Sequence, residues 1–244
     1  MTWRAALLCC AVFMLLPGRG ECQISQISRL VQTNGSAALL SDYRFRGESL
    51  SGGRAALQGT INFDLQGLYF GALASQASAH GTGFGTQAYA GFAQAINSRV
   101  SWEIGAVRYS YSSSEGAPKY EYTDLFAGAA TDSFGVRLYA SNNYLGIGTR
   151  AYYAEASANE AFGTNARWFA KLGYLYRSHG RQMLLYGAAP SVMDFKIGCA
   201  VTVTALRELT FEIAVSGTNV GNNRCAAYST HCTPALTAAV IKGF

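Results

Sequence analysis

The chain has 244 residues, of which only 14% are charged and 13% are aromatic, with 15 tyrosines, 27 glycines and 4 prolines. Water-soluble domains carry about 25% charged residues, so this composition is unusual for a soluble protein. The net charge of +5 is too small to indicate a nucleic-acid partner. No apolar run reaches the ~20 residues of a membrane-spanning helix, which excludes a bundle of such helices.

Residues 1–20 are predicted to be a cleaved signal peptide. Arg4 gives a basic start, residues 5–16 form an apolar run, and small residues follow before the expected cut. The run is too short to span a bilayer as a helix, so a membrane anchor is the weaker alternative. A lipoprotein at Cys22 is also weaker, because the preceding residues fit the lipidation motif poorly. Residues 21–244 are predicted to form one domain.

Alternating apolar and polar residues are the main structural signal, because successive side chains of a strand point to opposite faces. Near 100–111 the apolar residues change parity, which predicts a β-bulge near Gly105. About twelve strands are predicted, near 36–47, 55–65, 68–75, 85–95, 100–111, 120–129, 134–140, 151–158, 167–177, 191–204, 209–216 and 234–244.

The predicted connections alternate between long and short along the chain. The long ones are near 48–54, 76–84, 112–119, 141–150, 178–190 and 217–233, whereas most of the others are tight turns. One connection on the short side, about 159–166, is longer than the rest. Outer-membrane barrels have short periplasmic turns and longer outward loops. The pattern therefore predicts an all-β fold, a single antiparallel up-and-down transmembrane β-barrel with both termini in the periplasm.

Alternation alone does not say which face is inside. Three features favour lipid outside: the signal peptide, tyrosine-rich strand ends suited to an interfacial girdle, and the C-terminal Phe244. A final aromatic residue resembles the sorting signal read by the outer-membrane assembly machinery, although Lys242 departs from its apolar pattern. These features predict localisation in the bacterial outer membrane. A soluble secreted β-sandwich is the alternative.

Two stretches resemble the TorF-type porin family of proteobacterial outer membranes. The first is Ser41-Asp42-Tyr43-Arg44-Phe45-Arg46-Gly47, followed by Ala56-Leu57-Gln58-Gly59. The second is Met193-Asp194-Phe195-Lys196-Ile197-Gly198, followed by Leu209-Thr210-Phe211-Glu212-Ile213-Ala214. The resemblance implies an outer-membrane barrel with a role in passive solute uptake.

Charged residues within the predicted strands are expected in the lumen or at its rim, since each arginine facing lipid near the midplane costs about 2–4 kcal/mol. They either shape a mixed-charge pore or form ion pairs that fill a narrow barrel. These lumen or pore-lining candidates are Asp42, Arg44, Arg46, Glu48, Asp64, Glu103, Arg137, Glu155, Arg167, Lys171, Arg177, Asp194, Lys196 and Glu212.

Cysteines and histidines give little sign of catalysis or metal binding. Cys225 and Cys232 lie in the last predicted outward loop, and the oxidising periplasm favours a disulfide between them. With His231 they fall short of the four ligands of a structural zinc site. The other histidines, His80 and His179, also lie in predicted loops, so no strand presents a histidine beside an acid and a nucleophile. We expect no metal, no cofactor and no enzyme activity.

The predicted function is a porin-like channel for passive diffusion of small polar solutes through a mixed-charge lumen. The expected partners are outer-membrane lipid, these solutes and the assembly machinery acting on Phe244, with no nucleic acid. The main alternative is a closed structural or adhesive barrel whose outward loops bind a partner. An outer-membrane enzyme is a more distant one.

Overall fold

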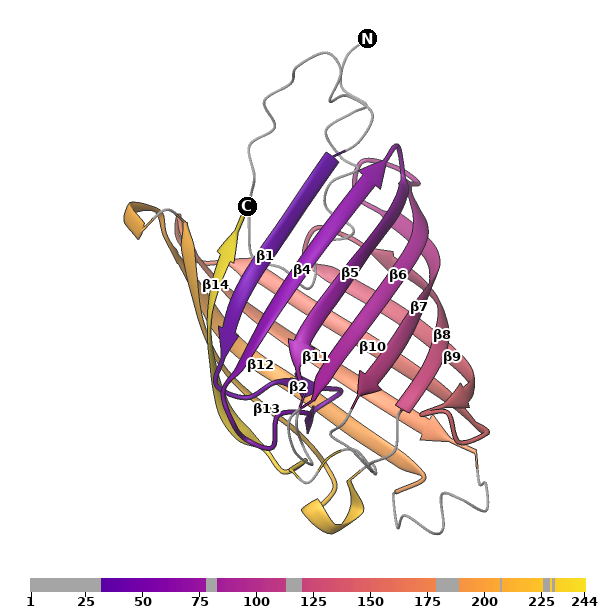
Figure 1. Cartoon of the computed structure of the whole chain (residues 1–244). Coiled ribbons are helices and arrows are strands. Elements are labelled where there is room, and N and C mark those ends of the chain that lie inside the picture. Colours follow the sequence, from indigo (N-terminus) through magenta and orange to yellow (C-terminus); the bar gives the residue numbers. More distant parts are fainter. Residues whose placement is uncertain are drawn as a thin grey trace.

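A closed antiparallel barrel of twelve strands makes up most of the computed structural model (Figure 1). The structure describes residues 32–77, 83–112, 120–178, 189–206, 208–225, 229 and 231–244, so the predicted signal peptide lies outside the described part. The barrel strands are β1 (Gln32–Leu40), β4 (Ala56–Leu65), β5 (Leu68–Gln76), β6 (Phe84–Ala95), β7 (Ser101–Ser112), β8 (Tyr120–Ala130), β9 (Phe134–Tyr144), β10 (Thr149–Ala161), β11 (Ala166–Arg177), β12 (Ser191–Val203), β13 (Leu209–Thr218) and β14 (Ala235–Gly243).

Each barrel strand pairs with the next one along the chain, and β1 closes the ring against β14. Two short strands, β2 (Arg44–Phe45) and β3 (Glu48–Ser49), form a separate two-stranded sheet. The 3₁₀ turns η2 (Thr204–Leu206) and η3 (Asn222–Arg224) are the helical segments of the described chain. None of the described helical segments has the length and hydrophobicity to cross a bilayer. The predicted all-β barrel is confirmed.

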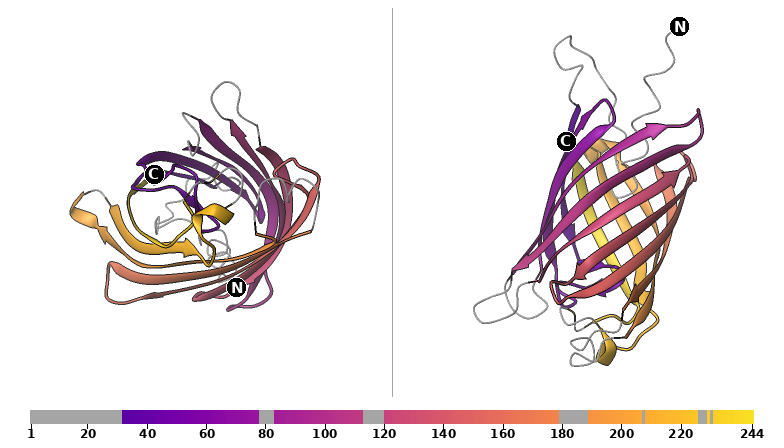
Figure 2. Two further views of the ribbon diagram at one scale, coloured as in Figure 1. Left: turned by 90° about the horizontal axis from the view of Figure 1, so that it is seen from below. Right: turned by 90° about the vertical axis from the view of Figure 1, so that its right-hand side faces the viewer.

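The two ends of the barrel differ in their connections. The chain ends at one rim, where the backbone nitrogen of Gly35 donates to the carbonyl of Phe244 over 2.9 Å, and tight turns such as that at Gln66 and Gly67 lie at this end. We call this end the terminal rim. The opposite end, which we call the loop rim, carries residues 41–55 and the turn η3 (Figures 1 and 2). The strand bounds show that most connections between strand ends at the loop rim are longer than those at the terminal rim. The predicted sorting of the connections is therefore present except at 141–150.

Two predictions about the wall are wrong. Residues 141–150 are not a long loop, because β9 and β10 continue to a short turn over 145–148. No bulge occurs at Gly105, where β7 pairs with both neighbours without a shift of register. The apolar residues change parity there because tyrosines on β7, such as Tyr109, point into the lumen, where they are buried.

The first predicted strand, 36–47, is also partly wrong. β1 begins earlier, at Gln32, and ends at Leu40, after which residues 41–55 leave the wall. The chain reverses at Arg46 and Gly47, whose φ angles are +50° and +75°. Two successive residues with positive φ are typical of a tight hairpin turn, and glycine adopts this conformation without steric cost. The turn makes residues 41–47 half of a hairpin, so they are not part of the wall.

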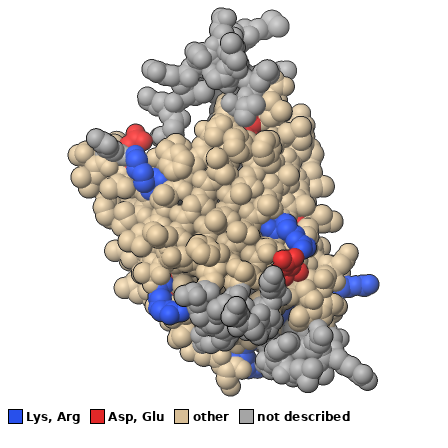
Figure 3. All heavy atoms as spheres, in the orientation of Figure 1, with Lys and Arg blue, Asp and Glu red and all other residues tan. Residues whose placement is uncertain are grey.

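The outer face of the barrel is apolar. Large hydrophobic side chains along it are strongly exposed, such as Leu57 at 59% and Ile213 at 60%, and the space-filling view shows few charges over its middle (Figure 3). Soluble monomers rarely expose contiguous apolar patches of more than a few hundred Å². Since Ile197 and Phe211 lie outside while their neighbours Lys196 and Glu212 form an ion pair, the apolar stripe faces outward. This orientation suits lipid.

Aromatic residues flank this apolar surface. Near the terminal rim the rings of Phe63 and Phe70 stack with centroids 5.0 Å apart. Toward the loop rim, exposed tyrosines lie on β10 and β11, with Tyr152 opposite Tyr176 in the register. The expected tyrosine girdle is therefore only partly present, because eight of the described tyrosines are buried.

The outward orientation predicts a depth-dependent effect of charge on stability. Ile213→Arg, at mid-strand on the lipid face, should lower the free energy of unfolding by about 2–4 kcal/mol. Leu206→Arg is the matched control at the terminal rim, where the cost should be about 0–1 kcal/mol. Urea titration of refolding into phospholipid vesicles measures both values. Equal effects would contradict the assignment of the lipid face.

Candidate functional site in the barrel lumen

Residues 41–55, which we call the lumenal hairpin, fold into the barrel from the loop rim. Viewed from that end, the hairpin lies within the ring of strands (Figure 2). Residues 46–51 are buried, with Glu48 and Ser49 exposed by no more than 1% and Arg46 by 6%, whereas Arg54 is exposed. The four charged candidates of the segment, 42, 44, 46 and 48, therefore lie on a loop inside the barrel, and not on a wall strand as predicted.

Arg46 attaches the hairpin to the opposite wall. Its Nη2 lies 2.6 Å from Oδ2 of Asp124 on β8, and both side chains are almost fully buried. The guanidinium carbon also lies 4.2 Å from the ring centroid of Tyr153 and 5.4 Å from that of Tyr139. Burial alone would lower the pKa of Arg46, but Asp124 and nearby tyrosines raise that pKa well above its ordinary value. The residue therefore remains a cation.

We call the rings around this guanidinium the aromatic cage. Cations are attracted to the faces of aromatic rings within about 6 Å, more strongly where water is excluded. Phe45 belongs to the hairpin itself, whereas the other three rings come from the wall strands β9 and β10. The cage consists of Phe45, Tyr139, Tyr144 and Tyr153.

A second ion pair holds the other arm of the hairpin. Glu48 Oε1 lies 3.4 Å from Nη2 of Arg177, whose side chain is completely buried at the end of β11. Arg177 also donates from Nη1 to the carbonyl of Ala189 over 3.2 Å. Both side chains are buried, so each one neutralises the charge of the other, which would otherwise be costly to remove from water.

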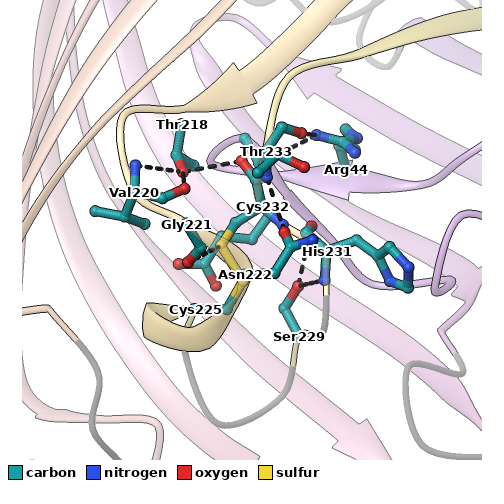
Figure 4. Close-up of a disulfide and its surroundings, with 12 residues drawn as sticks. Arg44, Thr218, Val220, Gly221, Asn222, Cys225, Ser229, His231, Cys232 and Thr233 are labelled. Carbon is teal, nitrogen blue, oxygen red and sulfur yellow. Dashed lines mark hydrogen bonds between the residues drawn. A yellow bond between two sulfur atoms is a disulfide. The ribbon is translucent and has the colours of Figure 1, made fainter.

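A disulfide-closed loop contacts the hairpin at the loop rim. Cys225 and Cys232 are bonded, with Cα atoms 5.9 Å apart (Figure 4). Arg44 Nη1 donates to the carbonyl of Thr233 over 2.9 Å, and the backbone nitrogen of Ser49 donates to the carbonyl of His231 over 2.8 Å. The loop between β13 and β14 therefore fixes the position of the hairpin.

Tyrosine rings fill much of the remaining lumen near the loop rim. The rings of Tyr109 and Tyr122 stack with centroids 4.6 Å apart, and Tyr122 meets Tyr144 edge-on at 4.9 Å. Phe45 of the hairpin packs on Tyr109 at 5.2 Å. These contacts form a buried aromatic core inside the barrel.

Ion pairs between wall strands continue toward the terminal rim, and we call them the charge ladder. Arg137 Nε donates to Glu103 over 2.7 Å across the side-chain-free Gly128 of β8. The other two pairs are Lys171 with Glu155 at 2.6 Å and Lys196 with Glu212 at 2.5 Å.

Small polar residues follow beyond the charge ladder. The hydroxyls of Ser36 and Thr60 are 2.8 Å apart, and those of Thr202 and Thr210 are 2.9 Å apart. No group of three or more histidine, cysteine or acidic side chains in the described part of the chain could hold a metal ion. The contacts described in this half of the lumen are hydrogen bonds and ion pairs.

The sequence model of a bacterial family described as "Bacterial protein of unknown function (Gcw_chp)" matches residues 29–244. The chain belongs to the Gcw_chp family. No curated protein matches its sequence.

Solved structures similar to this Gcw_chp barrel include porins. The KdgM porin is 11% identical, with a TM-score of 0.52 over 86% of this chain and 98% of that one. The NanC porin is 7% identical, with the same TM-score and coverages. OprD of Pseudomonas aeruginosa is 10% identical, with a TM-score of 0.47 over 88% of this chain and 67% of that one. At these identities the likeness to KdgM and NanC shows a shared porin barrel fold.

The structure places the fourteen sequence candidates in three groups. Asp42, Arg44, Arg46 and Glu48 belong to the hairpin. Arg177, paired with Glu48, is a wall residue, and the charge ladder contains Glu103, Arg137, Glu155, Lys171, Lys196 and Glu212. Three lie on the wall outside these pairs: Asp194, which accepts from Tyr153 over 3.2 Å, Arg167, whose guanidinium lies 5.6 Å from the Phe169 ring, and the half-buried Asp64.

Sequence reasoning missed Asp124 and the inward tyrosines of the Gcw_chp barrel. Asp124 alternates in phase with Tyr122 and Phe126 along β8, and all three are buried. The sequence signal for Asp124 is a carboxylate on the same strand face as tyrosines. Tyrosines are equally typical of the lipid interface, so this pattern alone does not place Asp124 in the lumen.

Gly47 offers a test of how the hairpin is held. A Cβ there would collide with the carbonyl oxygen of Gly217 and lie 2.8 Å from the Asp194 Cβ, at a φ of +75°. Gly47→Ala should displace the hairpin and expose Arg44 and Arg46 to trypsin in membrane-embedded protein. Gly53→Ala is the control, because its φ of +72° carries a similar backbone cost of about 1–2 kcal/mol with nothing within 4 Å.

Mass spectrometry of the trypsin fragments measures the exposure of the hairpin. Cleavage after the exposed Arg54 reports that the protease reaches the loop rim in every variant. Protection of Arg46 in Gly47→Ala equal to that in Gly53→Ala would contradict the packing described for the hairpin.

Proposed function

We propose that this Gcw_chp protein is an outer-membrane channel for passive diffusion of small polar solutes. One observation carries the proposal: a closed barrel presents an apolar face outward and a ladder of opposite charges inward. A barrel satisfies all of its backbone hydrogen bonds between strands, so it can span a bilayer. Charges on the inner wall give polar solutes partners that lipid does not offer.

The arrangement of the lumen supports a narrow, weakly selective path. Both signs of charge occur at each level of the charge ladder, so the inner wall does not favour one sign of solute strongly. The lumenal hairpin and the tyrosine core narrow the path at the loop rim. We therefore expect a small conductance.

Several features support placement in the outer membrane. The predicted signal peptide, 1–20, provides export, and the resemblance to TorF-type porins implies the same destination. Phe244 is 76% exposed at the terminal rim, where the assembly machinery could reach it. The porins KdgM and NanC share the fold.

A closed barrel whose outward loops bind a partner is the second candidate. The observation that favours it is the filling of the loop-rim half by the hairpin, which is attached through buried ion pairs. The two candidates differ in whether ions cross a bilayer that contains the purified protein.

Planar-bilayer recordings of the wild type test whether the protein conducts ions. The variant Lys196→Gln tests whether the ions pass the charge ladder. Lys196 has a 37% exposed side chain, and its replacement by glutamine removes a positive charge beside Glu212 in the lumen. The variant should shift the reversal potential in a potassium chloride gradient toward greater cation selectivity. Arg108→Gln is the matched control, because Arg108 is 52% exposed on the outer face and pairs there with Glu121.

The absence of conductance at any voltage, in both the wild type and the hairpin-displacing Gly47→Ala variant, would sink the channel proposal and favour the closed barrel. A conducting wild type with unchanged selectivity in Lys196→Gln would show that ions do not pass the charge ladder.

A further inference from the structure

The cation site around Arg46 is built mainly by the barrel wall. Asp124 lies on β8, Tyr139 and Tyr144 on β9, and Tyr153 on β10, which are neighbouring strands held in register. Arg46 itself comes from the lumenal hairpin, 78 residues away from Asp124 in the sequence. The wall therefore presents a preformed carboxylate and three aromatic rings to a group that is not part of it.

This site has hydrogen-bonding capacity that Arg46 leaves unused. Arg46 donates to one oxygen of Asp124, Oδ2. No described residue donates to the other oxygen, Oδ1, and the hydroxyl of Tyr122, two residues away on the same face, also has no partner among the described residues. Both residues are 1% exposed, and a polar group that is buried without a hydrogen-bond partner is energetically costly. A guanidinium can use both oxygens of a carboxylate with two parallel bonds.

We infer that Asp124 and the three wall tyrosines of the aromatic cage form a binding site for guanidinium-bearing solutes, which Arg46 occupies as a tethered ligand. This inference rests on the proposed function, because the solute must enter the lumen. A free guanidinium that takes the site displaces Arg46 and loosens the hairpin from the wall. The solute thereby favours the opening of its own path.

The geometry selects a guanidinium over other cations. The group is planar and weakly hydrated, so it stacks on rings and bonds a carboxylate at the same time. In the site the guanidinium carbon lies 4.2 to 5.8 Å from the rings of Tyr139, Tyr144 and Tyr153. A metal cation needs several oxygen ligands, whereas this site provides one carboxylate.

Tethering determines how the site behaves in the intact protein. A group on a short linker competes with an effective concentration in the millimolar range or above. The wild type should therefore bind free methylguanidinium at least about tenfold more weakly than a variant without Arg46. Removal of the tethered ligand exposes the site.

The first experiment measures binding without requiring a channel. Methylguanidinium should raise the thermal unfolding temperature of detergent-solubilised Arg46→Ala in a saturable manner, with a smaller effect on the wild type. The double variant Arg46→Ala/Asp124→Asn should show no such rise. Arg54→Ala, which removes an exposed arginine from the same loop, should behave as the wild type. If the smaller side chain of Arg46→Ala prevents folding, the variant Arg46→Gln is used in its place.

The second experiment measures passage. Arg46→Ala should conduct more than the wild type, and methylguanidinium should block that current with the concentration dependence seen in binding. Binding without current in any variant would overturn the channel function but support the site. Current without binding would overturn the site but support the channel. Equal binding by Arg46→Ala with and without Asp124→Asn, or by the wild type and Arg46→Ala, would also overturn the inference.

Discussion

The buried ion pair between Arg46 and Asp124 determines how the lumen is filled. Removing one partner of such a pair costs about 3–5 kcal/mol, because the other charge is left without compensation away from water. The pair therefore favours the position of the hairpin inside the barrel. The 2.6 Å contact between Arg46 and Asp124 helps to fill the loop-rim half of the lumen. The same contact defines the kind of group that could replace Arg46.

The barrel wall and the hairpin have different sources of stability. Each wall strand hydrogen-bonds to two neighbours around a closed ring, so the wall has no open strand edge. β2 and β3 are two residues each, and an isolated two-stranded hairpin is marginal in water. The hairpin depends on side-chain contacts with Asp124, Arg177 and the disulfide loop. Such a segment can change position while the wall stays intact.

Alternation predicted the wall well, because a lipid-facing stripe must be apolar at every second residue along each strand. It failed where the inner face is also apolar, as at Tyr109, since an inward tyrosine looks like a lipid-facing one in the sequence. It failed again over 41–47, because a lumenal hairpin alternates in the same way as a wall strand. The charged residues of the ladder could be placed in the lumen from the sequence, because a charged side chain that faces lipid is costly. The pairing of Arg46 with Asp124 could not, because it joins residues 78 positions apart.

The inner charges had two interpretations, a mixed-charge pore and a network of ion pairs that fills the barrel. Each interpretation describes a different half of one lumen. Toward the terminal rim the ladder pairs leave part of each lysine side chain exposed, at 26% for Lys171 and 37% for Lys196, so these charges are partly open to the lumen. Toward the loop rim the side chains of Arg46 and Asp124 are only 4% and 2% exposed, and aromatic rings surround the guanidinium. Discrimination between solutes is stronger where water is excluded, because electrostatic contacts weaken in high dielectric. The selective step of a channel built in this way lies at the hairpin, while the ladder maintains a polar wall beyond it.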